Sequence, residues 1–292
     1  MIVSITGGGG FIGKHLTEKH LHKDDTVRLL TRNLSFTQDC VEYFEGDLSD
    51  PGVELADFVE GSDLLYHCAG EINDESMMRP LHVDGTQRLV EASLKGGVGR
   101  WVQLSSVGAY GVCRSGVVTE MSPENPSSVY EKTKTEADDI VKSSGIPYVI
   151  LRPSNVFGLT MRNQSLFRLV EMIRRGWFFY IGEAGVLFNY VHVADVVEAL
   201  VLCGSDDRAY DKTYNLSQTI EIEHMVESIS LGLVVERKII RLPDYPIRLL
   251  GNAFGWLPGF PLTVSRIDAL TGRHRYQSSK IIEELGFEFD SS

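Results

Sequence analysis

The stretch TGGGGFIG at residues 6–13 decides the fold class of this chain of 292 residues. An apolar run at 2–5 precedes it, and residues 11–21 follow with the apolar spacing of a helix. A strand, a glycine-rich turn and a helix in this order predict a loop that approaches the pyrophosphate of a dinucleotide. Two registers fit the glycines, one on Gly8, Gly10 and Gly13 and the other on Gly7, Gly10 and Gly13.

Apolar runs alternate with helical patterns through the first two-thirds of the chain. The predicted strands are 2–5, 26–31, 41–44, 63–68, 100–105 and 148–151, and the predicted helices are 11–21, 81–94 and 130–142. This alternation predicts an α/β protein with a Rossmann-type, doubly wound parallel sheet covered on both faces. We expect residues 1–158, with 186–217 returning to them, to form an NAD(P)-binding domain. Residues 159–185 and 218–292 are expected to form a smaller C-terminal substrate-binding lobe.

Composition excludes several classes of protein. The chain has 28 Lys and Arg against 40 Asp and Glu, a net charge of −12, which disfavours general binding to nucleic acid and to anionic membranes. No run of about 20 apolar residues and no leader pattern is present. The four cysteines show no CxxC pairing, so we expect reduced thiols, a cytoplasmic protein and no metal site.

The charge is unevenly distributed along the chain. Residues 237–275 hold seven basic and two acidic side chains, a net charge of +5 on an otherwise acidic protein. This segment predicts local binding of an anion. An amphipathic helix at 244–256 is also compatible with a membrane surface, but the acidic body favours a substrate lid or an ordinary lobe.

Further short motifs follow the glycines in a fixed order. They are Gly46-Asp47-Leu48, His67-Cys68-Ala69-Gly70, Val83-x-Gly85-Thr86, Ser105-Ser106 with Tyr110-Gly111, Tyr130-x-x-x-Lys134, Arg152-Pro153-Ser154-Asn155-Val156-Phe157-Gly158, Val191-His192-Val193-x-Asp195, and Ser279-Lys280 with Glu284-Leu285-Gly286-Phe287. With Thr6 before the glycines, this series resembles the extended short-chain dehydrogenase/reductase family, of the NAD-dependent epimerase/dehydratase type with dihydroflavonol-reductase-like features. Family members are often dimers, so a homodimer is an expectation.

The resemblance implies a catalytic triad of Ser106, Tyr130 and Lys134. Tyrosine alone is a poor base at neutral pH, and a lysine four residues later on a helix supplies the positive charge that favours the phenolate. The same YxxxK spacing occurs at Tyr276 and Lys280, where the position in the C-terminal lobe favours a structural role.

The resemblance also implies the residues that contact the ligands. For the cofactor they are Gly7, Gly10, Phe11, Ile12, Gly13, Arg32, Asp47, Leu48, Ala69, Gly70, Tyr130, Lys134, Pro153 and Val156. For a small-molecule substrate they are Ser106, Asn155, Phe188 and Arg266. Arg32, with no acid beside it at the end of the second strand, favours NADP over NAD, because a guanidinium can grip a 2′-phosphate. Asp47 is either an adenine contact or a helix cap.

The reaction implied is hydride transfer at a secondary alcohol or ketone carbon. Val107-Gly108 replace the Asp-Glu pair of 4,6-dehydratases, which argues against dehydration, and His82 replaces the usual asparagine before Val-x-Gly-Thr. Phe188 and the apolar stretch 242–262 favour an apolar ketone, whereas Asn155 and the basic segment favour a nucleotide sugar. Two alternatives stay open: a nucleotide-sugar 4-epimerase with self-contained NAD, and a non-catalytic dinucleotide sensor, against which the Tyr/Lys pair argues.

Overall fold

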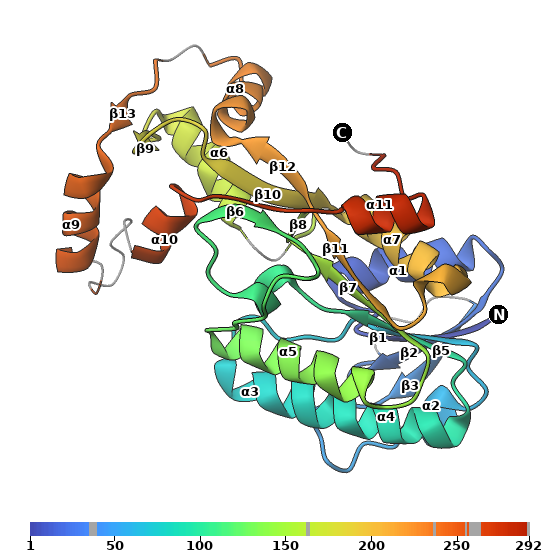
Figure 1. Cartoon of the computed structure of the whole chain (residues 1–292). Coiled ribbons are helices and arrows are strands. Elements are labelled where there is room, and N and C mark those ends of the chain that lie inside the picture. The colour runs from blue at the N-terminus through green and yellow to red at the C-terminus, as the bar shows by residue number, and fades with distance from the viewer. Residues whose placement is uncertain (35–39, 162–163, 236–237, 255, 257–263, 291–292) are drawn as a thin grey trace.

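The computed structural model describes the chain except for residues 35–39, 162–163, 236–237, 255, 257–263 and 291–292, and it leaves the side chains of 264–266 undescribed. A parallel sheet forms its centre, with the strand order β11-β7-β5-β4-β1-β2-β3 (Figure 1). The strands are β1 (Ile2–Thr6), β2 (Thr26–Thr31), β3 (Val41–Glu45), β4 (Leu64–His67), β5 (Arg100–Leu104), β7 (Tyr148–Pro153) and β11 (Lys212–Leu216). The order reverses between β1 and β4, where an open α/β sheet forms its binding crevice.

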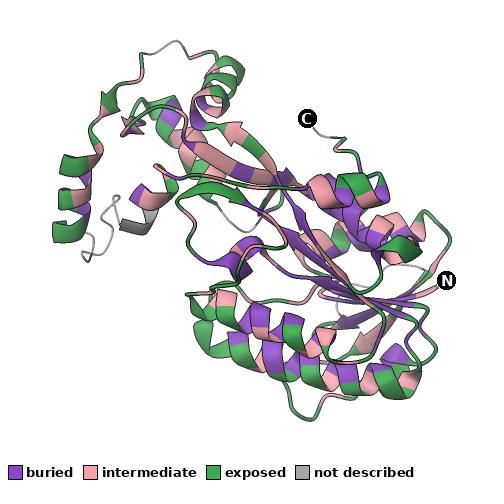
Figure 2. Cartoon of the chain, in the orientation of Figure 1, coloured by how far each residue is buried: buried purple, intermediate pink, exposed green. Residues whose placement is uncertain are grey.

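Helices cover both faces of this sheet. One layer contains α1 (Phe11–Leu21), α7 (Val193–Ser205) and α11 (Ser279–Leu285); the other contains α2 (Ala56–Val59), α4 (Gly85–Gly96) and α5 (Val129–Lys142), with α3 (Glu75–Arg79) and a π-helical turn η1 (Pro80–Asp84) leading into α4. The central strands β1, β4, β5 and β7 are almost entirely buried, whereas the edge strand β3 is partly exposed (Figure 2). This arrangement confirms the predicted doubly wound α/β fold.

The rest of the chain builds smaller sheets beside the large one. They pair β8 (Asn155–Phe157), β10 (Leu187–His192) and β12 (Gln218–Glu221), then β9 (Tyr180–Ile181) with β13 (Arg241–Leu242), and β6 (Ser115–Val118) with β14 (Arg273–Tyr276). The accompanying helices are α6 (Ser165–Arg175), α8 (Ile222–Gly232), α9 (Asp244–Phe254) and α10 (Val264–Ala269), and 3-10 turns lie at η2 (Val107–Tyr110) and η3 (Asp207–Ala209). Ile173, Phe178 and Ile222 belong to a separate apolar core here.

The end of the chain packs differently from the predicted lobe 218–292. Ile281 and Leu285 on α11 and the following Phe287 join the core of the large sheet. Glu284 fixes the helix from its polar side, accepting hydrogen bonds from Lys212 Nζ at 2.8 Å and from Tyr214 Oη at 2.9 Å. The final segment therefore returns to the cofactor-side core, since the apolar face of α11 is buried there.

Candidate active site

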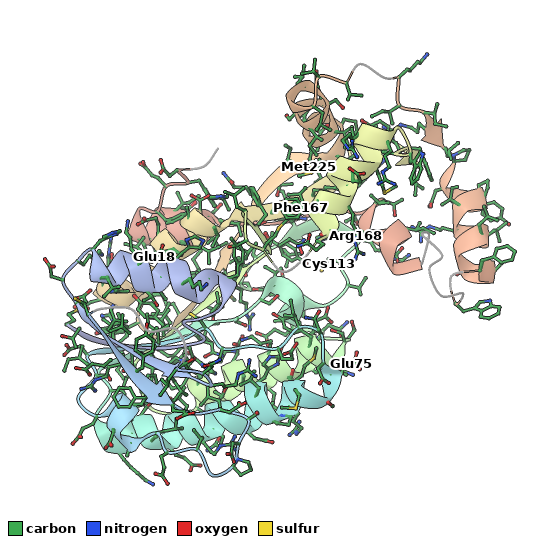
Figure 3. All side chains as sticks on the ribbon, turned by 180° about the vertical axis from the view of Figure 1, so that it is seen from behind. Glu18, Glu75, Cys113, Phe167, Arg168 and Met225 are labelled. Atoms are coloured by element: carbon green, nitrogen blue, oxygen red, sulfur yellow. The ribbon has the colours of Figure 1, made fainter. Side chains whose placement is uncertain are left out.

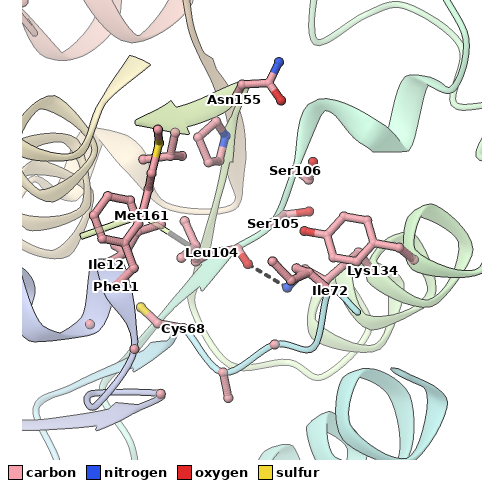
Figure 4. A pocket seen from close by; sticks show the side chains of 18 of the residues that line it. Phe11, Ile12, Cys68, Ile72, Leu104, Ser105, Ser106, Lys134, Asn155 and Met161 are labelled. Carbon is pink, nitrogen blue, oxygen red and sulfur yellow. Dashed lines mark hydrogen bonds between the residues drawn. The ribbon is translucent and has the colours of Figure 1, made fainter. Parts of the chain in front are cut away.

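A cavity of about 850 Å³ opens at the carboxyl ends of β1, β4, β5 and β7 (Figure 4). It brings together most of the residues predicted from the sequence to contact ligands. Those that line it are Gly7, Gly10, Phe11, Ile12, Gly13, Ala69, Gly70, Ser106, Tyr130, Lys134, Pro153, Asn155 and Val156. These residues come from five separate parts of the chain, and the parallel sheet is what places their strand ends at one edge.

The glycine loop forms one wall of the cavity, and its packing selects the register. Gly7 has φ of 70°, and a Cβ there would lie 2.7 Å from the backbone nitrogen of Ala69. A Cβ on Gly13 would lie 2.2 Å from the Gly7 carbonyl oxygen, to which the Gly10 N–H donates a hydrogen bond of 2.8 Å. Gly9 has open space around it. The glycines at 7, 10 and 13 therefore leave a bare backbone cradle before α1, which fits the phosphates of a dinucleotide.

Tyr130 lies in the first turn of α5, opposite the end of β5. A capping box fixes this helix start: Glu131 N–H donates to Ser128 Oγ at 3.2 Å, and Ser128 N–H donates to Glu131 Oε2 at 2.9 Å. Tyr130 and Ser106 both line the cavity, and their hydroxyl groups lie close enough to interact. Burial raises the pKa of Tyr130, and the nearby Ser106 hydroxyl opposes that rise. The phenol is thus neutral in the protein alone and lies near the hydroxyl that follows β5.

Lys134 lies one turn after Tyr130 on the same face of α5. Its Nζ donates a 2.7 Å hydrogen bond to the carbonyl oxygen of Leu104, drawn as a dashed line in Figure 4. Burial lowers the pKa of Lys134, while the Asp138 carboxylate a further turn along the helix raises it. The ammonium group is held inside the cavity wall with Asp138 as its counter-charge.

Ser105 and Ser106 have different roles although they are adjacent. Ser105 Oγ points into the protein and donates a 2.7 Å hydrogen bond to Asp138. Asp138 also forms a buried ion pair with Arg152, whose Nη2 lies 3.0 Å away and also donates to Glu124 Oε1 at 2.7 Å. Burial raises the pKa of Asp138 and Arg152 opposes the rise. Ser106, and not Ser105, therefore has its hydroxyl free to face Tyr130.

A chain of hydrogen bonds begins beside the glycine loop. Thr6 Oγ1 lies 2.6 Å from His67 Nδ1, and His67 Nε2 lies 2.9 Å from Thr86 Oγ1, which itself donates to the carbonyl oxygen of His82. Because Thr86 donates there, it accepts from His67, so His67 carries a proton on Nε2. Burial lowers the pKa of His67 well below its ordinary value, so the ring is neutral and this is its only proton.

The chain of hydrogen bonds continues to α5 through His82. The Glu71 N–H donates to His82 Nε2 at 2.9 Å, so the proton of this ring is on Nδ1, which lies 2.9 Å from Thr133 Oγ1. Thr133 Oγ1 in turn donates to the Val129 carbonyl oxygen at 2.9 Å. The π-helical turn η1 sets the ring edge-on to Tyr130, with 5.7 Å between the ring centroids. His82 thus connects the loop at Glu71 to the start of α5.

Three predicted cofactor contacts lie outside the cavity lining. Arg32, just after β2, is 74% exposed, and its Nη1 is 3.8 Å from Asp47 Oδ2. Asp47 Oδ1 accepts from the backbone N–H of Ser49 at 2.9 Å and from its hydroxyl at 2.7 Å, which closes a turn; the next helix, α2, begins only at Ala56, so Asp47 is not a helix cap. Leu48 is buried, and its carbonyl oxygen packs closely against Gly85: a Cβ on Gly85 would lie 2.7 Å from this oxygen. Asp47 and Leu48 therefore support the fold of this loop.

Two predicted substrate contacts have other placements. Phe188 does not line the cavity; it packs against the apolar core around Phe178 and Ile222. Arg266 lies in α10, and its side chain is outside the described residues. The second YxxxK pair is also away from the cavity: Tyr276 packs on Tyr110, and Lys280 Nζ donates to the Thr213 carbonyl oxygen at 3.0 Å.

Sequence reasoning missed several lining residues. They are Cys68, Ile72, Asn73, Leu104, Ser105, Ser154, Met161, Gln164, Ser165 and Arg168. Cys68, Ser105 and Ser154 are inside motifs quoted above, so their proximity was available as a signal. Residues 161–168 follow the Arg152–Gly158 motif with no pattern that marks them.

In the part of the chain that the structure describes, no cluster of three or more potential metal ligands occurs. No described helix has the length and apolar character needed to cross a membrane.

Comparisons with known proteins agree with this geometry. The model of the NAD dependent epimerase/dehydratase family matches residues 3–217. The chain is 25% identical over 333 residues to 3beta-hydroxysteroid-dehydrogenase/decarboxylase isoform 2 of Arabidopsis thaliana, across 97% of this chain and 58% of the plant protein. It is 28% identical over 219 residues to a putative UDP-glucose 4-epimerase of Methanocaldococcus jannaschii, across 68% of this chain and 72% of that protein.

A solved structure shows the same fold. UDP-glucuronic acid 4-epimerase from Bacillus cereus in complex with NAD superposes with a TM-score of 0.76 at 18% identity, across 100% of this chain and 94% of the epimerase. The chain belongs to the NAD-dependent epimerase/dehydratase family, within the extended short-chain dehydrogenases/reductases. It is an NAD(P)-dependent oxidoreductase or epimerase of that family.

Proposed function

We propose that this enzyme transfers hydride between a nicotinamide cofactor and the carbon of a secondary alcohol or ketone, using Ser106, Tyr130 and Lys134. One observation carries the proposal: the Ser106 hydroxyl, the Tyr130 phenol and the Lys134 ammonium group line one cavity together with the glycine cradle. A bound nicotinamide would accept or supply the hydride. The bare backbone at Gly7, and the first turn of α1 after it, would hold its phosphates.

Side chains of the protein would transfer the proton to or from the substrate oxygen. Ser106 would hold the substrate oxygen by a hydrogen bond, so that the oxygen lies beside the Tyr130 phenol. Tyr130 would take the proton from an alcohol or give it to a ketone oxygen. The positive charge of Lys134, one helical turn away, would stabilise the phenolate formed in the first case. The Asp138 carboxylate would help to keep that lysine charged, because it raises the pKa of Lys134, and the Leu104 carbonyl oxygen would hold the lysine in place.

For the cofactor, we propose a preference for NADP. Arg32 follows β2 directly, at the position that reads the adenosine ribose in this fold, and it is largely exposed to solvent. Among the described residues 32–34 no acidic side chain competes for the ribose. Titration of the purified enzyme with NADPH and with NADH tests this, and equal affinities would overturn the preference.

A nucleotide-sugar 4-epimerase that keeps its own NAD is the second candidate. Asn155 lines the cavity, as expected for a contact to such a substrate, and the similarity to the archaeal epimerase supports it. An epimerase returns the hydride to the substrate and consumes no added cofactor, whereas a reductase consumes NADPH in proportion to product. A sensor would bind the cofactor with no turnover at all.

The test compares two tyrosines that share the same sequence motif. Tyr130→Phe should abolish turnover of a panel of ketones, secondary alcohols and UDP-glucose, while its affinity for NADP changes less than about twofold. Tyr276→Phe, in the second YxxxK pair, should retain normal turnover, because that ring lies outside the cavity. Retained turnover in Tyr130→Phe would overturn the proposed function.

A further inference from the structure

One end of the cavity is built by the start of α6 rather than by the large sheet. Met161, Gln164, Ser165 and Arg168 line it there, away from the glycine loop in the sequence. Arg168 lies in the first turns of the helix and is labelled in Figure 3. This end is where a substrate would extend when its reacting carbon is beside Tyr130, because the glycine loop occupies a different wall.

The charged side chains in the cavity wall are all positive among the described residues. The lining contains Lys134 and Arg168, and none of the described lining residues is Asp or Glu. Lys134 is buried and already held by the Leu104 carbonyl oxygen next to the catalytic tyrosine. Arg168 is therefore the cation that remains for a group on the substrate itself.

The side chain of Arg168 has no hydrogen bond or ion pair with any residue that the structure describes; only its backbone N–H is bonded, to the Gln164 carbonyl oxygen at 2.9 Å. The carboxylate nearest in the helix sequence, Glu171, is taken by two other arginines. Arg174 Nε donates to Glu171 Oε2 at 2.7 Å and its Nη2 donates to Oε1 at 2.8 Å, and Arg175 Nε also donates to Oε1. The guanidinium of Arg168 consequently keeps all its donors for a ligand.

The basic segment 237–275 differs in this respect. Arg241 pairs with Glu223, Arg248 with Asp244 and Asp268, and Arg273 with Glu183. Those arginines are neutralised within the protein, so the prediction that this segment supplies the anion site is not supported by them.

We propose that Arg168 binds an anionic group of the substrate, a carboxylate or a phosphate, at a distance from the carbon that reacts beside Tyr130. This rests on the proposed function for the reacting end of the cavity. A planar guanidinium forms two parallel hydrogen bonds with either group, which a neutral substrate cannot offer. Two kinds of substrate would supply such an anionic group: an apolar alcohol or ketone that carries a carboxylic acid, and a nucleotide sugar, through its diphosphate.

The test measures binding to the NADP-loaded enzyme by calorimetry, with two sets of probes. One set is a series of apolar hydroxy acids with their methyl esters; the other is UDP-glucose with uridine. The wild-type enzyme should bind the anionic member of at least one set more tightly than its neutral counterpart. Arg168→Gln should weaken the binding of that anionic member by about ten- to hundredfold. Arg174→Gln, on the same helix but outside the cavity lining, should change it less than about twofold.

The outcomes separate the proposals. A loss confined to the hydroxy acids supports a carboxylate, and a loss confined to UDP-glucose supports a diphosphate. If the wild-type enzyme prefers no anionic probe, if Arg168→Gln binds them all as before, or if it loses NADP binding instead, the assignment of Arg168 is overturned. Because these are binding measurements, they hold whether or not turnover depends on Tyr130, which the Tyr130→Phe comparison decides separately.

Discussion

Replacement of His82 by asparagine should make the protein less sensitive to acid. In the folded protein the His82 ring is neutral: Nε2 accepts from the Glu71 N–H, and Nδ1–H donates to Thr133. A second proton on Nε2 would break the first of these bonds and place a positive ring near Lys134. Burial, and then the charge of Lys134, lower the pKa of His82 to about 3, whereas Glu71 opposes the shift.

The size of the effect follows from the two pKa values. In the unfolded chain His82 binds a proton below its ordinary pKa of 6.5, but in the folded protein it does so only near 3. The unfolded state therefore binds more protons between these values, and stability falls as the pH falls through that range. At 1.36 kcal/mol per pKa unit, acidification from about pH 7 to about pH 4.5 should remove roughly 2–3 kcal/mol through this residue.

Urea unfolding of the wild-type protein and of His82→Asn at several pH values between about 4.5 and 7 measures this. Asparagine keeps one acceptor and one donor for the Glu71 and Thr133 partners but does not titrate. Any loss of packing energy caused by the substitution is the same at each pH. The slope of the free energy of unfolding against pH therefore reports the titration of the His82 ring alone. The variant should show the shallower slope. Parallel profiles for the two proteins would refute the neutral-ring assignment.

The remaining predictions concern the cradle and the buried ion pair. Gly13→Ala should weaken NADP binding more than about tenfold, because its Cβ would meet the Gly7 carbonyl oxygen at 2.2 Å, whereas Gly9→Ala, with open space around it, should bind normally in the same titration. Arg152→Leu should lower the free energy of unfolding by about 3–5 kcal/mol in urea, because it leaves the Asp138 carboxylate buried without its partner. A loss of less than about 1 kcal/mol would contradict this prediction and show that the Arg152–Asp138 ion pair contributes little to stability.

Much of the sheet was predictable because its signals are local. The strand at Ile2–Thr6, the helix at Phe11–Leu21 and the strand at Thr26–Thr31 have the expected bounds or differ by one residue. Strand ends in a parallel sheet meet at one edge, so the motifs after them converge on one cavity. Tyr130 and Tyr276 satisfy the same pattern, and only their positions relative to the strands separate them.

Other features depend on partners that are distant in the sequence. The charge sum over 237–275 omitted Glu183 and Glu223, which neutralise Arg273 and Arg241 from other elements. The spacing of α6 predicts its apolar face, but which polar side chain reaches the cavity depends on how the helix sits beside β8 and the loop before it. For that reason Arg168 had no marker in the sequence.

The most direct test of the central claim needs no substrate. If Tyr130 is the proton acceptor, its phenol, whose pKa burial raises in the protein alone, ionises more readily once positive charge from an oxidised nicotinamide joins that of Lys134. Tyrosinate absorbance is followed against pH for the wild-type enzyme and for Tyr130→Phe, each with and without NADP. We expect one tyrosine that ionises below the ordinary pKa of about 10, only with cofactor bound and only when Tyr130 is present. Identical titration curves for the two proteins in the presence of NADP would contradict it.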